Sequence, residues 1–572
     1  MKKFFYIFLG VMMIPNVLLV LSEHQNLWTA ACNLLLPLGL YWLAAASSHK
    51  FGRTVWLMFP FIFLAAFQIV LTRLFSQSII GVDMFLNVVT TNLTEVNELL
   101  GSLIPAVAIV FILYIPMLVM ASIAMRRRRR LGASFVNIQR RLAAVCIGFG
   151  LLSGIVAHNG SKPMRLIDDI FPVNVSYNLC LAVNRYWKTE HYPSTSKGFT
   201  FHAQPFQTHQ TSQPSQTPQT SQTHQTSQTS QTPRTPQTPQ PPNKTILLVI
   251  GETARAANFG ILGYERNTTP KLSKIQGLVS FPKAYTESNT THKSVPMLLS
   301  AVSSVDFDSL YRQRSIITAF REAGFRTAFF SNQRRNGSFI DFFGKEADVC
   351  KFIKDDAAPS QNILDERLID YVKREVANTS QPLFMVLHCY GSHFNYRERY
   401  PRQFARFLPD VAMEARRENR QNLLNAYDNT ILYTDHVLNR LVEVLRSKGS
   451  EAVMIYTSDH GEDIYDDGRH FLHASIVPTD YQLHVPLFVW TSQSYEANHR
   501  SIVKALKSNS GATISTSLSL FHTILQMAGV STPFFVASHS FSDSSLVVPH
   551  RYFINDRNEA VLLQGKTIVN KQ

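Results

Sequence analysis

Apolar residues are concentrated in the first third of the chain, where they form long stretches. Each stretch has about the 20 residues that a helix needs to cross a bilayer. The stretches cover residues 1–21, 27–46, 54–72, 102–125 and 142–158. They predict five membrane-spanning helices, with the two ends of the chain on opposite sides of the membrane. A cleaved signal peptide is an alternative for the first stretch, but no small-residue cleavage site follows Leu21.

Basic residues between these stretches predict the orientation of the helices, because Lys and Arg in short loops stay on the cytoplasmic side. They lie at the start of the first stretch, after the second and between the fourth and fifth: Lys2, Lys3, His49, Lys50, Arg53, the run 126–130, Arg140 and Arg141. With five helices, all of these positions fall on the same side of the membrane. The loop 73–101 and everything after His158 are therefore expected outside the cytoplasm, in the periplasm if the membrane is a Gram-negative inner membrane.

A low-complexity segment lies at residues 204–243, which are almost wholly Gln, Thr, Ser and Pro in imperfect SQTPQT-like repeats. Arg234 carries its only formal charge. Such a composition cannot build a hydrophobic core. We predict a disordered tether between the membrane unit and the C-terminal part of the chain, with mucin-like glycosylation as a further possibility.

Beyond this segment, short β-rich runs alternate with amphipathic stretches. The runs are 245–250, 326–330, 383–387, 452–457 and 485–490. This alternation predicts a parallel sheet covered by helices on both faces, which is an α/β/α sandwich. The expected parts are a membrane domain, a connecting segment, a linker and a catalytic domain, at 1–158, 159–203, 204–243 and 244–572.

Polar clusters follow four of the five runs. They are GETAR (251–255), SNQRR (331–335), HCYGSH (388–393) and SDHGED (458–463). Ligands collect beyond the carboxyl ends of parallel strands, so four clusters at one sheet edge favour a single site. Glu252, Asp459 and His460 offer the oxygen and nitrogen ligands that zinc accepts. Taken alone, an Asp-His pair is more often a loop salt bridge, and the joint pattern carries the prediction.

A nucleophile candidate lies in a fifth segment, where Thr290 and Thr291 precede SVP. Ser294 is expected to cap a helix whose first turn contains Pro296. The N–H groups of such a helix start would face an anionic phosphate. A hydroxyl needs a base or a metal to become a nucleophile, so Thr291 beside a zinc site is chemically sensible, although alone it would be a turn or capping residue.

The formal net charge of +15 does not indicate a nucleic-acid-binding protein. The Arg run is explained by membrane topology, and no stripe of alternating aromatic and basic residues suggests a base-reading surface. Of the five cysteines, Cys32 and Cys146 lie in the apolar stretches. The other three, Cys180, Cys350 and Cys389, allow at most one internal disulfide.

With these motifs assembled, the chain closely resembles the phosphoethanolamine transferases of Gram-negative inner membranes, which include lipid A modifiers and polymyxin-resistance enzymes. The likeness covers the five stretches, GETAR, the Thr-rich segment ending in SVP, GSH followed by RYP, and SDHGE. It implies a soluble domain with the alkaline phosphatase and sulfatase fold. It also implies a monomer that binds Zn²⁺, takes phosphatidylethanolamine as donor and modifies a lipid A phosphate or a core sugar of lipopolysaccharide.

The resemblance assigns roles residue by residue. The zinc ligands would be Glu252, Thr291, Asp459 and His460, with Thr291 also the residue that carries phosphoethanolamine. Substrate handling would fall to His393 and His473, and recognition of the lipid donor to Asn87, Thr91 and Glu95, whose four-residue spacing predicts one helix face. Lipid A-specific members flank the nucleophile segment with a disulfide, where this chain has Glu287 and Met297.

Three alternatives remain open. A sulfatase needs C/S-x-P-x-R, whereas this chain reads Ser-Val-Pro-Met-Leu at 294–298. A phosphoglycerol transferase of the lipoteichoic acid type shares five spans and a Thr nucleophile, but GETAR and GSH with RYP favour the phosphoethanolamine branch. A catalytically silent membrane scaffold or receptor would have little reason to keep every metal and nucleophile position.

Overall fold

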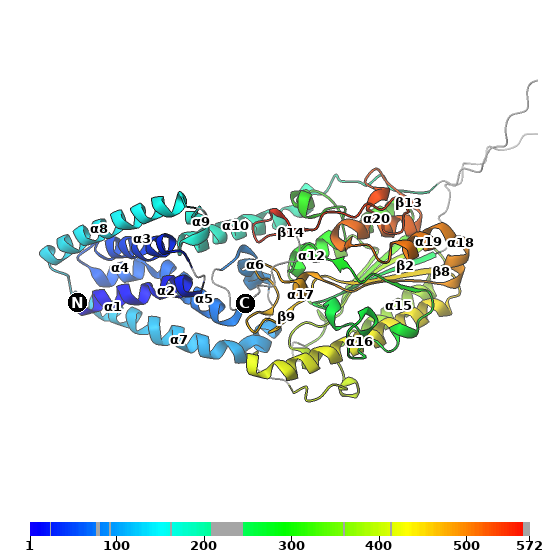
Figure 1. Ribbon diagram of the computed structural model, residues 1–572, viewed down its shortest axis with the longest axis horizontal. Helices are drawn as coiled ribbons and strands as arrows, with labels where there is room; N and C mark the ends of the chain where they lie inside the picture. The colour runs from blue at the N-terminus through cyan, green and yellow to red at the C-terminus, as the bar shows by residue number, and fades with distance from the viewer. Residues whose placement is uncertain are drawn as a thin grey trace, which may run out of the picture.

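The computed structural model describes residues 1–22, 25–75, 80–90, 93–160, 163–206, 244–358, 361–411 and 415–563. Two units follow one another along its long axis, a helical unit from the N-terminal part and an α/β unit from the rest (Figure 1). Most of the predicted Gln/Thr/Ser/Pro linker, residues 207–243, lies outside the described residues.

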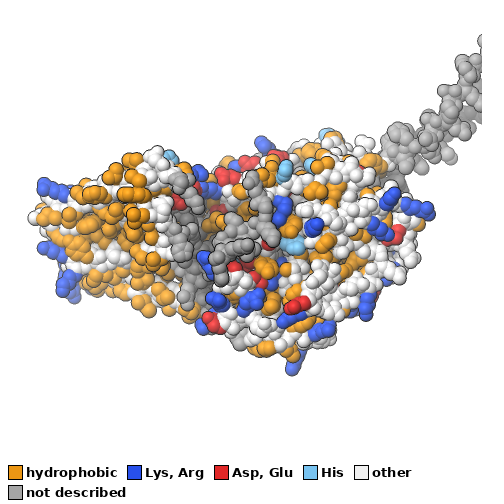
Figure 2. All heavy atoms as spheres, in the orientation of Figure 1, with side chains coloured by type: hydrophobic (Ala, Val, Ile, Leu, Met, Phe, Trp, Pro, Cys, Tyr) orange, Lys and Arg blue, Asp and Glu red, His pale blue; other side chains and the backbone are white. Residues whose placement is uncertain are grey.

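The helical unit contains the apolar stretches. Its helices are α1 (Lys2–Met12), α2 (Ile14–Ser22), α3 (Leu27–Ala45), α4 (Phe51–Leu57), α5 (Phe59–Phe75), α7 (Leu93–Arg126) and α8 (Ala133–His158). Within the described residues, four spans meet the length and hydropathy of a membrane crossing, and α4 with α5, bent by 57°, makes up to five. Apolar side chains cover this unit, and Lys and Arg side chains gather at its far end (Figure 2), as expected for membrane-spanning helices.

Two further helices connect the units. The helix α6 (Val82–Thr90) lies in the predicted extracytoplasmic loop and packs against α10 (Val173–Glu190), which follows the one-turn α9 (Leu166–Asp169). After α11 (Tyr192–Thr195), the chain enters the core of the α/β unit, where Phe201 is fully buried. The predicted connecting segment therefore contributes side chains to the core of the α/β unit.

Both ends of the low-complexity segment lie on the α/β unit. Strand β1 (Gln204–Pro205) pairs with β13 (Val530–Ser531), and the Phe206 N–H donates to the Gly529 carbonyl at 2.8 Å. A β-carbon on Gly529 would lie 3.9 Å from Lys244 Nζ, at the other end of the segment. The described residues on either side of 207–243 therefore both lie on the α/β unit, whereas the disordered tether itself stays a prediction.

The central sheet has seven strands in the order β3-β11-β8-β2-β7-β5-β6. Their bounds are β2 (Lys244–Gly251), β3 (Leu278–Ser280), β5 (Arg326–Ser331), β6 (Val349–Phe352), β7 (Leu383–His388), β8 (Glu451–Ser458) and β11 (Leu487–Thr491). Five are mutually parallel, and β11 runs antiparallel to both of its neighbours, β8 and β3, so β3 points in the same direction as those five. The all-parallel prediction fails at β11 because only the one-turn helix α17 (Asp480–Leu483) lies between β8 and β11 to return the chain.

Helices cover both faces of this sheet (Figure 1). On one face lie α12 (Thr291–Leu298), α13 (Ile316–Glu322), α14 (Phe339–Gly344) and α20 (Thr516–Ala528), and on the other α15 (Arg367–Asn378) and α16 (Arg420–Ser447). Side chains of the central strand β2 alternate between the two cores, Leu248 facing one and Leu247 the other. The predicted combination of membrane helices and an α/β/α sandwich is confirmed.

Candidate metal and nucleophile site

Two neighbouring strands deliver the predicted ligands to one edge of the sheet. Gly251 at the end of β2 is in register with Ser458 at the end of β8, so Glu252 leaves the sheet beside Asp459 and His460. One ligand atom from each of these three residues lies within 4.8 Å of the others. Their exposed fractions are 1%, 0% and 0%. The parallel register therefore assembles the cluster that the strand-end motifs predicted.

Thr291 reaches the cluster from α12, which begins earlier than predicted. Thr290 is the N-cap, and the N–H groups of Lys293 and Ser294 bond to its carbonyl. Ser294 therefore lies inside the helix and does not cap it, because the Thr290 carbonyl already starts the helical bonding. As a result, Thr291 occupies the first helical turn, where free N–H groups and the positive end of the helix dipole face outward.

The Thr291 hydroxyl contacts two of the three ligand candidates. Its Oγ1 donates to Glu252 Oε1 at 2.8 Å and lies 3.2 Å from His460 Nε2. His460 Nδ1 lies 2.8 Å from the Gly461 carbonyl, which can only accept, so Nδ1 carries the proton. Because the Thr291 hydroxyl points its proton at Glu252, the lone pairs of the threonine oxygen and of His460 Nε2 point toward each other. A cation between them would satisfy both.

The electrostatics of the cluster also fit a divalent cation. Burial raises the pKa of Glu252, and burial with the neighbouring Glu252 charge raises the pKa of Asp459 well above its usual range. Asp459 Oδ1 accepts from the Thr253 and His460 N–H groups, while no described residue hydrogen-bonds to Oδ2. Two adjacent buried carboxylates with so little compensating charge are typical of a metal site. Oxygen ligands with one imidazole suit zinc.

Gln333 is a further site residue that the sequence did not single out. Its Nε2 donates to Glu252 Oε2 at 2.8 Å and to the Cys389 carbonyl at 3.2 Å. Glu252 is therefore fixed through one oxygen by Thr291 and through the other by Gln333. The sequence feature that could have identified Gln333 is its position in SNQRR, directly after β5. Only the strand order reveals which polar side chain of that cluster faces the site.

Gly391 lets the HCYGSH segment pass close to Glu252. Its φ is +52°, and a β-carbon would lie 2.7 Å from the backbone nitrogen and oxygen of Glu252. Only glycine avoids both the left-handed strain and the clash.

Both predicted substrate histidines lie beside the cluster. The His473 ring centroid is 4.3 Å from that of His460 and 6.5 Å from that of His393. Burial opposes the charged form of His473, but the Glu462 carboxylate, 3.6 Å from His473 Nδ1, outweighs it and raises the pKa of His473. Burial, with the nearby Arg399 charge, lowers the pKa of His393 to about 3. The pKa values of the two imidazoles are thus shifted in opposite directions.

The predicted donor-binding residues are only partly described. Asn87 lies in α6 and Glu95 in α7, while Thr91 lies outside the described residues. The single helix face that the spacing predicted therefore stays a prediction. All five cysteines are described and free, so no disulfide joins Cys180, Cys350 and Cys389.

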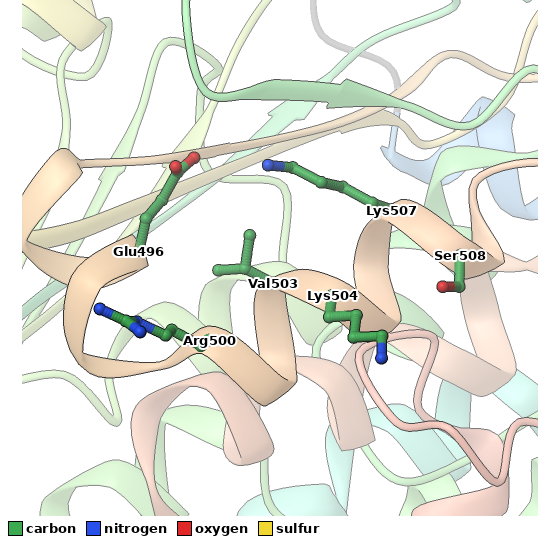
Figure 3. Close-up of a pocket in the computed structure, with 6 residues that line it drawn as sticks. All are labelled: Glu496, Arg500, Val503, Lys504, Lys507 and Ser508. Atoms are coloured by element: carbon green, nitrogen blue, oxygen red, sulfur yellow. The ribbon is translucent and has the colours of Figure 1, made fainter.

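A surface pocket of about 510 Å³ lies at the other edge of the sheet. It is formed over α18 (Gln493–Asn498) and α19 (Arg500–Asn509), with the side chains shown in Figure 3. β11 ends there, opposite the beginning of β8, whereas the Thr291 cluster follows the end of β8. This pocket is separate from the candidate site.

Comparison with known proteins places the chain in a family. A family model described as Sulfatase matches residues 244–530, and the chain belongs to this family. Kdo(2)-lipid A phosphoethanolamine 7''-transferase of Salmonella typhimurium is 29% identical over 301 residues, 50% of this chain and 52% of that protein. The chain thus spans about half the length of the curated relatives it matches. The resemblance to phosphoethanolamine transferases indicated by the motifs is confirmed.

Two solved structures share the fold. Integral membrane phosphoethanolamine transferase EptA from Neisseria meningitidis matches with a TM-score of 0.70 at 21% identity, covering 94% of this chain and 97% of that one. The C-terminal periplasmic domain of EptC from Escherichia coli, in complex with zinc, has a TM-score of 0.52 at 23% identity, covering 57% and 93%. The first likeness includes the membrane helices as well as the α/β unit.

Proposed function

We propose that this chain transfers phosphoethanolamine from phosphatidylethanolamine to a cell-envelope acceptor, a lipid A phosphate or a lipopolysaccharide core sugar, through a covalent phosphoethanolamine-Thr291 intermediate. The observation that carries the proposal is the Thr291 hydroxyl, hydrogen-bonded to Glu252 at 2.8 Å beside a buried Asp-His pair. Relatives that carry out phosphoethanolamine transfer support it.

In the first step, Thr291 Oγ1 attacks the donor phosphorus. Glu252 Oε1 accepts the threonine proton, and its raised pKa suits that role. The new bond joins Thr291 Oγ1 to phosphorus, and the bond from phosphorus to the diacylglycerol oxygen breaks. His473, whose pKa is raised, can give its proton to the departing oxygen. Diacylglycerol leaves and phosphoethanolamine stays on the threonine.

In the second step, an acceptor oxygen attacks the same phosphorus. His473, neutral after the first step, takes the acceptor proton with His393 beside it, and the bond from phosphorus to Thr291 breaks as Glu252 returns its proton. The first-turn N–H groups of α12 stabilise negative charge on the phosphoryl oxygens in both steps. The burial of the ligand residues limits the access of water that would hydrolyse the intermediate.

Zinc is the proposed cofactor, held by Glu252, Thr291, Asp459 and His460. When bound, zinc would act as a Lewis acid that lowers the pKa of the Thr291 hydroxyl and offsets phosphoryl charge.

The membrane helices give this site access to a lipid donor. The site edge of the sheet faces the helical unit, since His292, next to Thr291, contacts Asp83 of α6 at 3.1 Å. We propose an inner-membrane monomer whose catalytic domain lies in the periplasm and whose donor lipid contacts Asn87, Thr91 and Glu95. Membrane lipids and the acceptor are its partners, and nucleic acid is not.

Mass spectrometry of lipid A and core glycans tests the reaction. Cells expressing the chain should gain one phosphoethanolamine unit per modified acceptor, and Thr291→Ala should reduce the gain by more than about 10³-fold because the nucleophile is lost. Ser294→Ala is the matched control, since among the described residues this hydroxyl on the same helix bonds only the Thr290 carbonyl. Full transfer by Thr291→Ala, or no gain in either fraction with the unchanged chain, would contradict the proposal.

A further inference from the structure

A buried group of charges joins the membrane unit to the helix that carries Thr291. Asp83, on α6, accepts from Lys293 Nζ at 2.6 Å and lies 3.1 Å from His292 Nε2. Arg185, on α10, adds a third donor at 3.4 Å. The side chains of Asp83 and Lys293 are 9% and 2% exposed. Residues far apart in the sequence thus converge on one carboxylate.

The segment 555–556, after strand β14 (Tyr552–Ile554), completes this group. Asp556 accepts from the N–H groups of Val82 and Asp83 at 2.5 and 2.8 Å, so it caps the start of α6. The Asp556 carbonyl accepts from Arg185 at 2.7 Å, and the Asn555 carbonyl accepts from Lys293 at 2.8 Å. The position of Asp83 is therefore fixed by its backbone as well as by its side chain.

The buried position of the Lys293 side chain at the start of α12 depends on its ion pair with Asp83. Lys293 lies in the first turn, where the helix dipole disfavours a cation, and its ammonium group is buried. Removing one partner from a buried ion pair leaves an uncompensated charge and destabilises its surroundings strongly. The first turn of α12 therefore keeps its present orientation because Asp83 receives Lys293. Thr291 is two residues away in that same turn, so its hydroxyl is oriented by the same contact.

We propose that Asp83 is a positioning residue for the transfer reaction: by receiving Lys293, it orients the first turn of α12 so that Thr291 Oγ1 faces Glu252. The inference rests on the proposed function, and it adds that Thr291 is correctly oriented only while α6 is docked on the catalytic unit. Because α6 also carries Asn87, the nucleophile and the expected donor-binding helix are held as one assembly.

Four variants separate this role from general stability. Asp83→Ala removes the partner of Lys293, Asp83→Ala with Lys293→Met removes both, and Asp83→Glu keeps the charge. Asp168→Asn is the matched control, because Asp168 on α9 pairs with Arg557 of the C-terminal segment without contacting α12. All are studied as the full chain in phospholipid nanodiscs, with melting temperature and zinc content recorded for each.

Hydrogen–deuterium exchange of the amides in α12 tests the anchoring independently of any reaction. Asp83→Ala should raise exchange in the first turns of α12 at least tenfold, and adding Lys293→Met should reverse part of that rise because no unpaired ammonium remains buried. Asp168→Asn should leave α12 exchange unchanged. Equal exchange of α12 in Asp83→Ala and the parent protein would overturn the inference, whatever the transfer assay shows.

Transfer kinetics test the consequence for Thr291. With saturating phosphatidylethanolamine, Asp83→Ala should lower kcat by about 10- to 100-fold, as a small displacement of a reacting group does, while Asp83→Glu retains most of the rate. The double variant should exceed Asp83→Ala in kcat. Unchanged kcat in Asp83→Ala would overturn the positioning role. A parent protein without transfer would instead defeat the proposed function, and the exchange result would still decide whether Asp83 anchors α12.

Discussion

The residues of the candidate site hold one another through several independent contacts. Glu252 is fixed by Thr291 through one oxygen and by Gln333 through the other, and Asp459 Oδ1 accepts two backbone N–H groups. His460 is oriented by the Gly461 carbonyl. Such supporting contacts orient the ligand atoms in advance of metal binding.

Removing one ligand should release the metal. We expect Asp459→Ala to raise the Kd for zinc by more than about 100-fold, because losing a direct ligand exceeds the 10- to 100-fold effect of losing a supporting group. Mass spectrometry of bound metal in the purified chain measures this. Asp467→Asn, in the same loop but paired with His470 on the surface, is the control and should keep its zinc. Equal zinc in Asp459→Ala would argue against the assigned ligand set.

Gly391 gives a second prediction at this scale. Gly391→Ala should destabilise the protein by about 1–3 kcal/mol and weaken zinc binding, because its β-carbon would displace Glu252. Gly449→Ala is the control, since Gly449 has φ +69° and open space around it. That variant should lose only about 1 kcal/mol from left-handed strain and keep its zinc affinity. Thermal melting and zinc titration distinguish the two, and identical behaviour would contradict the clash.

Among the elements, the long helix α16 fixes a surface segment through one buried carboxylate. Asp435 accepts from the N–H groups of Lys271 and Leu272 at the start of the 3₁₀ turn Leu272–Lys274. Burial raises the pKa of Asp435 to about 6 despite these bonds. The folded protein therefore binds this proton more tightly than the unfolded chain does.

This pKa predicts a pH dependence of stability. Asp435 contributes fully to the free energy of unfolding below the pKa that it has in the unfolded chain. This contribution, on the order of 3 kcal/mol, is lost as the pH rises from about 4 to about 6. Asp435→Asn cannot ionise, so its melting temperature should fall less than that of the parent protein between those pH values. Asp370→Asn, at an exposed ion pair with Arg367, is the control. Parallel melting curves for Asp435→Asn and the parent would refute the assignment.

At the scale of the whole molecule, the two units are joined by structured segments. Helix α10 packs on α6, the chain after α10 enters the core of the α/β unit, and the C-terminal segment returns to cap α6. The Gln/Thr/Ser/Pro segment leaves and re-enters the α/β unit beside Gly529. The relative placement of the units therefore does not depend on that segment.

Replacing residues 207–243 with a short Gly/Ser loop should accordingly leave kcat within about twofold, since the cost of closing a loop changes only slowly with its length. Transfer by the full chain in nanodiscs provides the measurement. As a control, replacing 204–206 as well removes β1 and should lower the melting temperature. A large loss of transfer on replacing 207–243 alone, at unchanged melting temperature, would show that the segment has a role in the reaction.

The sequence by itself determined the membrane spans, most strands of the sheet and the ligand candidates, because each depends on local periodicity or on a motif at a strand end. Glu252, Thr291, Asp459 and His460 were all identifiable in this way. Tertiary structure alone decided that Gln333 supports Glu252, that β11 runs antiparallel and that the low-complexity segment closes on one unit. It also decided the pairing of Asp83 with Lys293. These features depend on strand order and on contacts between residues far apart in the sequence, which no local pattern encodes.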